Sequence, residues 1–384
     1  MSNNTQPEIR FPGFMEDWEQ RKLGDFIDVK SGKDYKHLNS GSIPVYGTGG
    51  YMLSVDRALS DIDAIGIGRK GTIDKPYLLK APFWTVDTLF YAVPKQNIDL
   101  QFSLSIFKKI NWKKFDESTG VPSLSKTVIN SVGASVPSYE EQKKIGSFFK
   151  QLDETIALHQ RKLDLLKETK KGFLQKMFPK NGAKVPEIRF PGFTGDWEQR
   201  KLGQVANYRR GSFPQPYGNK EWYDGENSMP FVQVVDVGDN LRLVEDTKQK
   251  ISELAQPKSV FVAEGKVVVT LQGSIGRVAI TQYPAYVDRT LLIFESYKAE
   301  MDEYYFAYVI QQLFEYEKTR APGGTIKTIT KEALSNFTIS FPSIAEQKKL
   351  GKFFEQLDDT IALHQRKLDL LKETKKGFLQ KMFV

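Results

Sequence analysis

The chain has 384 residues, enough for two ordinary domains, with a formal net charge of +8, three histidines and no cysteine. The lack of cysteine excludes a disulfide framework, thiolate metal sites and a cysteine nucleophile, and three scattered histidines exclude a multi-histidine metal site. No apolar run approaches the roughly 20 residues that cross a bilayer, and the first residues contain no signal-peptide apolar region, so we expect a cytoplasmic protein.

Two sequence repeats set the organisation of the chain. The segment PEIRFPGF, followed two residues later by DWEQRKLG, spans residues 7–24 and returns at residues 186–203. Residues 137–178 return as residues 342–383 with 36 of 42 positions identical. The segments between these repeats do not match. The chain therefore holds two different variable segments in one repeated frame.

Both variable segments are predicted to mix strands and helices. Short apolar runs bounded by Gly and Pro predict strands at residues 43–46, 64–67, 89–93, 231–235, 267–271 and 291–294. Helices are predicted at residues 100–107 and 303–314. A weak alignment places residues 64–73 opposite 267–276, and residues 120–125 opposite 324–329. We expect one shared fold whose exposed residues differ.

The usual signatures of a catalytic site are missing from the sequence. Gly66, Gly68 and Gly71 have the spacing of a dinucleotide-binding loop, but residues 72–76, TIDKP, are a poor helix start. Thr72 also stands where a phosphate-binding loop requires Lys. The Asn- or Asp-Pro-Pro-aromatic motif of amino-methyltransferases and a nucleophile elbow are both absent. We expect a chain that is not an enzyme.

The long repeat predicts a helix with a coiled-coil seam. Ser138 and Glu141 have the spacing of a capping box, which Ser343 and Glu346 repeat. Apolar residues then recur in heptads, over a rod of roughly 60 Å. The predicted seam residues are Ile145, Phe149, Leu152, Ile156, His159, Leu163 and Leu166, with Leu350, Phe354, Leu357, Ile361, His364, Leu368 and Leu371 in the second copy.

Polar residues interrupt the seam at His159 and Lys170, and again at His364 and Lys375. We interpret them as residues that fix helix register and partner choice. The alternative is a metal-binding or catalytic histidine. Because only the short linker 179–185 follows the first helix and a whole domain lies between the two helices, we predict that they pair antiparallel.

Together these features resemble the specificity subunit of type I restriction-modification enzymes, over nearly the whole chain. The motifs that carry the resemblance are Pro-Ser-x-x-Glu-Gln-Lys-Lys at Pro137 and Pro342, Phe-Phe-x-Gln-Leu-Asp at Phe148 and Phe353, and Asp-Trp-Glu-Gln-Arg-Lys-Leu-Gly at Asp17 and Asp196. The implied fold class is α/β (α+β): two mixed α/β target recognition domains separated by a long antiparallel two-helix coiled coil, with a pseudo-two-fold internal repeat.

The resemblance also implies domain boundaries. These are a first target recognition domain at 1–136, a first long helix at 137–178, a linker and repeat opening at 179–196, a second target recognition domain at 197–341, and a second long helix at 342–384.

The function that the resemblance implies is recognition of double-stranded DNA. Each target recognition domain would bind one half of a bipartite target, and the helices would set the spacing and dock two adenine methyltransferase subunits. Restriction and translocase subunits would join the same complex. S-adenosylmethionine, ATP and magnesium are expected in those partner subunits, with no cofactor in this chain and no membrane partner.

The family does not supply base-reading residues, so the candidates come from side-chain chemistry. Arg and Lys can pair with guanine, Gln can pair with adenine, and small residues let the backbone approach phosphate. The two long repeats hold +6 of the net charge of +8, so the basic clusters of the variable segments are local. The candidates are Lys33, Lys36, Tyr46, Thr48, Arg69, Lys70, Ser123 and Lys126, and Arg209, Arg210, Tyr217, Gln272, Arg277 and Lys327.

Other interpretations stay open for these residues and for the whole chain. Each candidate could instead be a solvated loop charge or a structural residue. Trp18 and Trp197 are expected to anchor cores, because a reader of variable sequence would not be repeated in both halves. The chain could also be a coiled-coil scaffold that binds proteins, with absent or sequence-independent DNA affinity, or a DNA-binding remnant without enzyme partners.

Overall fold

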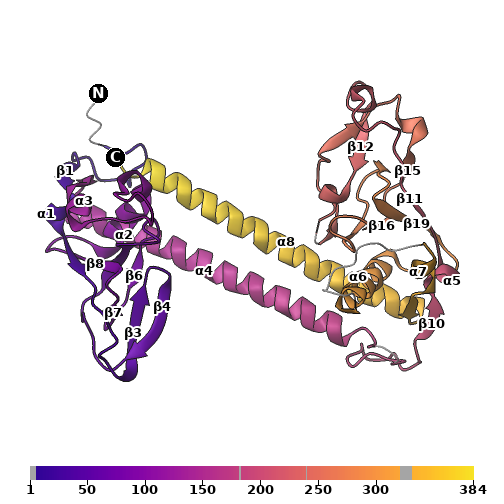
Figure 1. Cartoon of the computed structure of the whole chain (residues 1–384), viewed down its shortest axis with the longest axis horizontal. Coiled ribbons are helices and arrows are strands. Elements are labelled where there is room, and N and C mark those ends of the chain that lie inside the picture. The colour runs from indigo at the N-terminus through magenta and orange to yellow at the C-terminus, as the bar shows by residue number, and fades with distance from the viewer. Residues whose placement is uncertain (1–5, 181–182, 239, 321–330) are drawn as a thin grey trace. The chain divides into compact units, whose positions relative to one another are not determined.

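The chain folds into two units, and each combines one variable segment with parts of both long helices (Figure 1). The computed structural model describes residues 6–180, 183–238, 240–320 and 331–384. The first unit comprises Met1–Lys162 and Gln365–Val384, and the second comprises Leu163–His364. The last residues of the sequence therefore fold with the first variable segment.

The first unit contains a four-stranded sheet, a three-stranded sheet and a two-stranded ladder. The four-stranded sheet has the order β2 (Ile27–Ser31), β8 (Leu89–Pro94), β5 (Ala64–Gly68) and β6 (Tyr77–Leu79). The other strands are β4 (Gly50–Val55), β3 (Ser40–Gly47) and β7 (Trp84–Thr85) in one sheet and β1 (Glu19–Lys22) with β9 (Gly133–Val136) in the ladder. The helices that accompany them are α1 (Leu23–Phe26), α2 (Leu100–Lys109), the 3-10 turn η1 (Trp112–Phe115) and α3 (Lys126–Ser131).

The second unit repeats this plan with a larger sheet. Its five-stranded sheet has the order β11 (Ala206–Arg210), β19 (Leu291–Tyr297), β16 (Val267–Thr270), β17 (Val278–Ile280) and β13 (Leu241–Arg242). The other strands are β14 (Gln249–Ile251), β12 (Met229–Val232), β18 (Ala285–Val287) and β15 (Val260–Val262) in one sheet and β10 (Glu198–Lys201) with β20 (Thr338–Phe341) in a ladder. The helical elements are α5 (Leu202–Val205), η2 (Lys220–Trp222), η3 (Val234–Asp236), η4 (Gln256–Lys258), α6 (Glu303–Arg320) and α7 (Lys331–Asn336).

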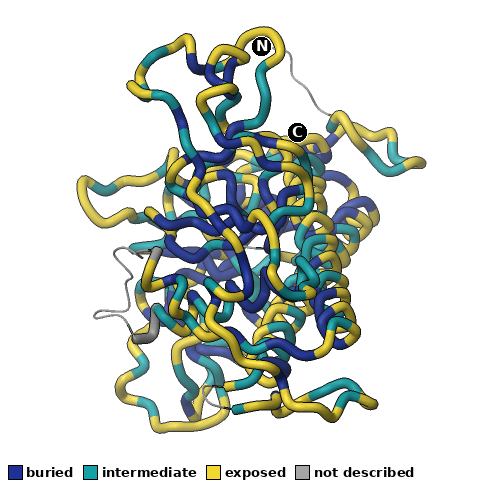
Figure 2. The backbone as a smooth tube through the Cα atoms, turned by 90° about the vertical axis from the view of Figure 1, so that its right-hand side faces the viewer, coloured by how far each residue is buried: buried dark blue, intermediate teal, exposed yellow. Residues whose placement is uncertain are grey.

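The two variable segments share a sheet core although their sequences differ. The order β2-β8-β5-β6 in the first unit corresponds to β11-β19-β16-β17 in the second. A parallel pair stands beside each core, β3 with β7 and β12 with β18. Buried residues gather in these strands and helix faces, and the connecting loops are mostly exposed (Figure 2). The shared mixed α/β fold predicted from the weak alignment is confirmed.

The long helices are α4 (Tyr139–Lys176) and α8 (Ile344–Lys381), and they pack antiparallel. In the first unit the beginning of α4 meets the end of α8, with the rings of Phe148 and Phe378 centred 5.1 Å apart. In the second unit the end of α4 meets the beginning of α8, with Phe173 and Phe353 centred 5.3 Å apart. The predicted antiparallel pairing is therefore correct.

We call the two copies of the short repeat, residues 7–24 and 186–203, the opening repeats. Each adds to its unit a strand and a backbone hydrogen bond to the end of a long helix. The strands β1 and β10 have the same sequence and pair in the same register, Glu19 with Val136 and Glu198 with Phe341. The amide of Ile9 donates to the carbonyl of Lys381, and the amide of Ile188 donates to the carbonyl of Lys176. Both units therefore join an opening repeat to the end of a long helix in the same way.

The two repeated tryptophans lie in hydrophobic cores, as predicted. Trp18 is 2% exposed and contacts the rings of Phe102 and Phe383 at 6.1 Å each. Trp197 is 3% exposed and packs against Phe178 and Tyr305. Because Phe178 and Phe383 end the two long repeats, the opening repeat and the helix end complete one core in each unit.

The acidic residues predicted to complete the capping boxes have a different partner. The helices do begin directly after Ser138 and Ser343. However, both oxygens of Glu141 accept hydrogen bonds from Arg10 at 2.8 Å, and those of Glu346 accept from Arg189 at 2.7 Å. The carboxylates therefore tie the opening repeat to the start of the helix that closes the same domain.

The next residue of the repeat fixes a second helix. Gln142 accepts a hydrogen bond from the amide of Asp99 at 3.0 Å and donates to the carbonyl of Pro137 at 2.9 Å. Asp99 in turn caps α2 by accepting from the amide of Phe102. Gly146 makes this approach possible, because a Cβ there would lie 2.3 Å from Oδ1 of Asp99. Gln347, Asp302 and Gly351 repeat the arrangement at α6.

None of the predicted seam residues is exposed. Ile145, Phe149 and Leu163 on α4 are buried, as are Leu350, Phe354 and Leu368 on α8. The remaining positions of the seam are half-buried, and they are Leu152, Ile156, His159 and Leu166, with Leu357, Ile361, His364 and Leu371. Within the ranges that the structure describes, no group of three or more metal-ligating side chains is placed to hold an ion.

The lysines that interrupt the seam pair with acidic residues of the opposite helix. Lys170 contacts Asp358 at 2.6 Å, and Asp358 also accepts from the hydroxyl of Tyr308 at 2.5 Å. Lys375 contacts Asp153, which Lys108 also contacts at 2.7 Å. Since a lysine one turn out of register would lose its partner, these pairs support the interpretation that the polar seam positions fix register.

The Asp153 cluster gives a pH-dependent prediction. Burial opposes its charged form, but the hydrogen bonds from Lys108 and Lys375 outweigh burial and hold the pKa of Asp153 below its ordinary value. A lowered carboxyl pKa stabilises the fold above the unfolded value of about 4, and this stability is lost as the pH falls through the folded value. We therefore expect the unfolding free energy of Asp153→Asn to decrease less than that of the wild type as the pH is lowered. Urea titrations between about pH 6 and 2 measure this, and an unchanged slope would contradict it.

One predicted strand needs correction. The strand predicted at residues 231–235 ends at Val232, and η3 follows it. The cause is Asp236, whose carboxylate accepts hydrogen bonds from the amides of Gln233 and Lys248 and so turns the chain. The predicted counterpart of residues 120–125, at residues 324–329, lies outside the described residues.

Candidate nucleic-acid interface

Four of the predicted DNA-binding residues of the first unit line one open cavity of about 670 Å³. They are Arg69, Lys70, Ser123 and Lys126. We call this cavity the basic groove, and it is lined by Ser31, Arg69, Lys70, Asp87, Thr88, Phe90, Glu117, Ser123, Leu124, Ser125 and Lys126. Its sequence-distant parts are the end of β5, the turn before β8 and the loop before α3.

Backbone hydrogen bonds hold the three parts of the basic groove together. The amide of Arg69 donates to the carbonyl of Thr88 at 2.8 Å, and the amide of Leu124 donates to the carbonyl of Arg69 at 2.9 Å. Gly71 donates to Pro122 and has a φ of +99°, a conformation that favours glycine. The groove is therefore set by the backbone, and its side chains can vary without changing its frame.

The loop before α3 is ordered by its own acidic residues. Asp116 accepts hydrogen bonds from the amides of Ser123 and Ser118, and these bonds hold its pKa below the ordinary value. Glu117 accepts from the amide of Ser125, which itself caps α3. With these acids engaged by backbone amides, the basic groove presents Arg69, Lys70 and Lys126 around small hydroxyl residues. That composition suits phosphate and base-edge contacts.

The other predicted residues of the first unit lie outside this cavity. Lys33 is exposed, and its amide donates to the carbonyl of Thr85 beside the groove. Thr48 lies in the turn between β3 and β4, where its hydroxyl would be 3.7 Å from a Cβ on Gly71. Tyr46 is half-buried and packs on Tyr51 and Tyr77. Lys36 is exposed and is not part of the groove lining.

In the second unit the predicted residues divide into three groups. Arg210 and Gln272 are exposed beside the turn between β18 and β19, and Tyr217 contacts that turn through Asp288 at 2.6 Å. Arg209 faces Glu295 at 3.9 Å on the sheet surface. Arg277 is half-buried and donates to the carbonyl of Val237. The sixth residue, Lys327, lies outside the described residues.

The predicted alignment of the two variable segments is wrong by one residue. The amide of Leu271 donates to the carbonyl of Thr290, as that of Arg69 donates to Thr88. Lys70 therefore corresponds to Gln272, whereas the sequence alignment had paired Gln272 with Arg69. The alignment failed because β5 and β16 are buried on both faces, so neither strand has the alternation of apolar and polar residues that would fix the register of an alignment.

Two exposed residues near these sites were missed from the sequence. They are Asp87, which lines the basic groove, and Arg289, at the equivalent position of the second unit. The segments share Val-Asp and Thr-Leu, in Val86-Asp87-Thr88-Leu89 and Val287-Asp288-Arg289-Thr290-Leu291. This match pairs Asp87 with Asp288 and treats Arg289 as an insertion, so the equivalence of Asp87 and Arg289 is found only from the fold.

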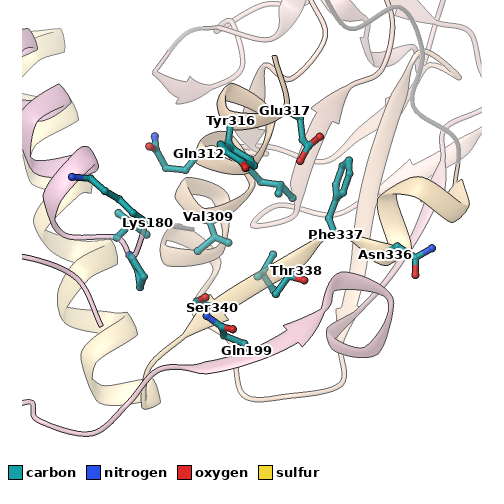
Figure 3. Close-up of a pocket in the computed structure, with 14 residues that line it drawn as sticks. Lys180, Gln199, Val309, Gln312, Tyr316, Glu317, Asn336, Phe337, Thr338 and Ser340 are labelled. Atoms are coloured by element: carbon teal, nitrogen blue, oxygen red, sulfur yellow. The ribbon is translucent and has the colours of Figure 1, made fainter. Parts of the chain in front are cut away.

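A second cavity lies away from these residues, in the second unit (Figure 3). It has a volume of about 500 Å³ and lies between α6, β20, β10 and residues 178–180, which follow α4. Val309, Gln312 and Tyr316 of α6 line one side, and Thr338 and Ser340 of β20 line another. A smaller cavity of about 140 Å³ occupies the corresponding place in the first unit. Both cavities are bordered by residues of the repeated segments, so we do not assign them to the variable surfaces that would contact DNA.

The family follows from the sequence profile described as "Type I restriction modification DNA specificity domain", which matches residues 15–168 and 194–373. The chain belongs to the type I restriction-modification DNA specificity family. It contains two specificity domains and is the DNA specificity subunit of a type I restriction-modification system. The expectation of a non-catalytic chain is confirmed. Among the residues described, no helix has the length and apolarity needed to cross a membrane.

Relatives and solved structures agree with this family. The putative type I restriction enzyme MjaX specificity subunit of Methanocaldococcus jannaschii is 23% identical, over 95% of this chain and 92% of its own length. The MjaVIII specificity subunit of the same organism is 22% identical, over 95% and 91%.

The fold is also that of known specificity subunits. The crystal structure of the type I S subunit from M. genitalium matches with a TM-score of 0.74 at 15% identity, covering 99% of both chains. A structure described as the basis of complex assembly and conformational transition of the type I system matches with a TM-score of 0.55 at 18% identity, covering 98% and 99%. The predicted fold of two α/β halves with paired long helices is confirmed.

Proposed function

We propose that each variable domain of this specificity subunit binds one half of a bipartite double-stranded DNA target. In the first domain the contact surface is the basic groove, with Lys33 and the Tyr46–Thr48 turn beside it. In the second it is the surface around Arg210, Gln272 and Tyr217. The observation that carries the proposal is the cavity itself, where Arg69, Lys70 and Lys126 from distant segments meet on a frame shared by both domains.

The finer assignments of partners and cofactors are also proposals. The antiparallel helices would set the spacing of the half-sites and dock two adenine methyltransferase subunits. Half-sites one helical turn apart are roughly 34 Å from one another, and 38 residues of α4 extend about 57 Å. Restriction and translocase subunits would complete the complex. S-adenosylmethionine, ATP and magnesium would be bound by these partners and not by this chain, and the complex would work in the cytoplasm.

Methylation mapping tests this function directly. The chain is co-expressed with the adenine methyltransferase subunit of its own system, and 6-methyladenine in the host DNA is mapped by long-read sequencing. We expect one split motif that requires this chain and that changes in one half only when residues 1–136 are exchanged for another variable domain. Unaltered methylation despite a purified complex of both proteins would favour a scaffold that does not read DNA.

Removing charge from the basic groove should weaken binding to the first half-site. The variant Arg69→Ala/Lys70→Ala/Lys126→Ala is expected to lose at least about tenfold in affinity for target DNA, since single base or phosphate contacts contribute about 1–3 kcal/mol. Fluorescence anisotropy at fixed salt measures the loss. The control Arg57→Ala/Lys75→Ala removes exposed charge outside the groove lining. Equal losses in both variants would contradict a role for the groove.

A further inference from the structure

We infer that one exposed turn residue in each domain reads a base, Asp87 a cytosine and Arg289 a guanine. This inference rests on the proposed function, and it assigns specificity to positions that the sequence alone did not indicate. Its basis is a turn with the same backbone hydrogen bonds in both domains, in which the first domain has the negatively charged Asp87 and the second has the positively charged Arg289.

Matched backbone hydrogen bonds show that the turns are equivalent. The amide of Leu89 donates to the carbonyl of Val86 at 3.0 Å, and the amide of Leu291 donates to that of Asp288 at 3.0 Å. Each turn therefore has two central residues, Asp87-Thr88 in the first domain and Arg289-Thr290 in the second. Thr88 and Thr290 accept from the end of β5 and of β16, respectively. Asp87 and Arg289 thus occupy the same place on the shared sheet core.

The neighbouring glycines confirm the equivalence of the two turns. A Cβ on Gly32 would lie 2.6 Å from the carbonyl oxygen of Thr85 and 1.9 Å from that of Val86, and a Cβ on Gly211 would lie 2.1 Å and 2.4 Å from those of Val287 and Asp288, which are the equivalent residues. Both turns are therefore pressed against a glycine, and neither can move inward. In each turn the preceding residue is buried, and Asp87 and Arg289 are exposed.

The surroundings of Asp87 favour a base edge over a phosphate. It lies in a groove that holds Arg69, Lys70 and Lys126, yet its carboxylate forms no salt bridge with a cation of the described residues. A free carboxylate near a DNA phosphate would be repelled. The major groove offers two amino donors to a carboxylate, those of cytosine and adenine, and adenine places the acceptor N7 beside its amino group, so an acceptor-only carboxylate is better suited to cytosine. Arg69 supports the turn by donating to the carbonyl of Asp87 at 3.3 Å.

Arg289 is held in position for a planar contact. Its guanidinium lies 4.9 Å from the centre of the Tyr217 ring. The hydroxyl of Tyr217 donates to Asp288 at 2.6 Å, and the hydroxyl of Thr290 donates to the other oxygen of the same buried carboxylate. The ring and the turn are therefore fixed to one another. A guanidinium oriented in this way can donate two parallel hydrogen bonds to O6 and N7 of guanine.

The experiment uses the full chain with its methyltransferase subunit and maps methylated motifs for Asp87→Asn and Arg289→Lys. Asp87→Asn removes the charge and adds a donor, so one position of one half-site should lose its preference for cytosine by about tenfold or more and accept adenine. Arg289→Lys keeps the charge but loses the planar pair of donors. It should make one position of the other half-site degenerate, with overall DNA affinity changed by less than about threefold.

The control and the outcomes separate this inference from the proposed function. Asp61→Asn neutralises an exposed carboxylate near the opposite end of β5 and should leave the motif unchanged. All variants should melt within about 2 °C of the wild type, because the substituted residues are exposed. If the wild type methylates a split motif and both variants keep that motif intact, the inference fails and the proposed function stands. If the wild type methylates no split motif, the proposed function itself fails.

Discussion

Replacing Leu163 and Leu368 with aspartate is expected to disrupt the helix pair and abolish assembly with methyltransferase subunits. These leucines are 1% and 0% exposed, and they occupy the same position in the two repeats. Leu→Ala at such sites costs about 2–5 kcal/mol, and an unpaired buried carboxylate adds to that cost. We therefore expect a loss of helical signal and a fall in melting temperature of more than about 10 °C, measured by circular dichroism.

The repeat supplies a matched control for this experiment. Leu165 and Leu370 lie two residues further along the same helices and are 67% and 68% exposed. Changing both to aspartate introduces the same chemistry on the solvent face, and the melting temperature of the free chain should change by less than about 3 °C. If the Leu163 and Leu368 variant melts like the wild type and still forms the complex, the buried seam does not organise the molecule.

The repeated frame could be predicted from the sequence because its signals are local. Heptad spacing and the position of Ser138 and Ser343 predict where each long helix begins, and the short linker predicts the antiparallel pairing. Because Trp18 and Trp197 occupy the same position of a repeated segment, the sequence predicted that they lie in cores and do not read variable DNA. In each case the pattern lies within a few turns of chain, or the duplication itself carries the information.

The rest depends on contacts between distant segments, which no local pattern contains. Glu141 has the spacing of a capping residue, but its partner is Arg10, 131 residues away. The basic groove arises where Arg69, Thr88 and Leu124 meet through backbone hydrogen bonds. The one-residue error in the alignment has the same origin. Short apolar strands do not fix their register by themselves, and only the pairing with neighbouring strands decides it.

The ion pair between Arg10 and Glu141 should contribute strongly to the stability of the first unit. The side chain of Glu141 is 1% exposed and that of Arg10 is 12% exposed, and the pair is bidentate. The pKa of the Arg10 guanidinium is raised, chiefly by its hydrogen bond with Glu141. Arg10→Ala would leave a buried carboxylate without its cation, which costs about 3–5 kcal/mol. Urea unfolding should show this loss, and Arg189→Ala should show a similar loss through Glu346 in the second unit.

An exposed pair on the same helix tests whether burial is the cause. Lys150 and Glu154 lie 3.9 Å apart with side chains 55% and 65% exposed, so Lys150→Ala should cost less than about 0.5 kcal/mol. The double variant Arg10→Met/Glu141→Leu removes both charges and should recover much of the stability that Arg10→Ala loses. A cost below about 1 kcal/mol for Arg10→Ala would mean that the opening repeat is held mainly by Trp18 and the β1–β9 ladder. If Arg10→Ala is costly and the double variant recovers stability, the cost comes from leaving Glu141 buried without its cation. The pair would then act mainly to specify how the opening repeat docks, because the fold tolerates the loss of both charges but not of one.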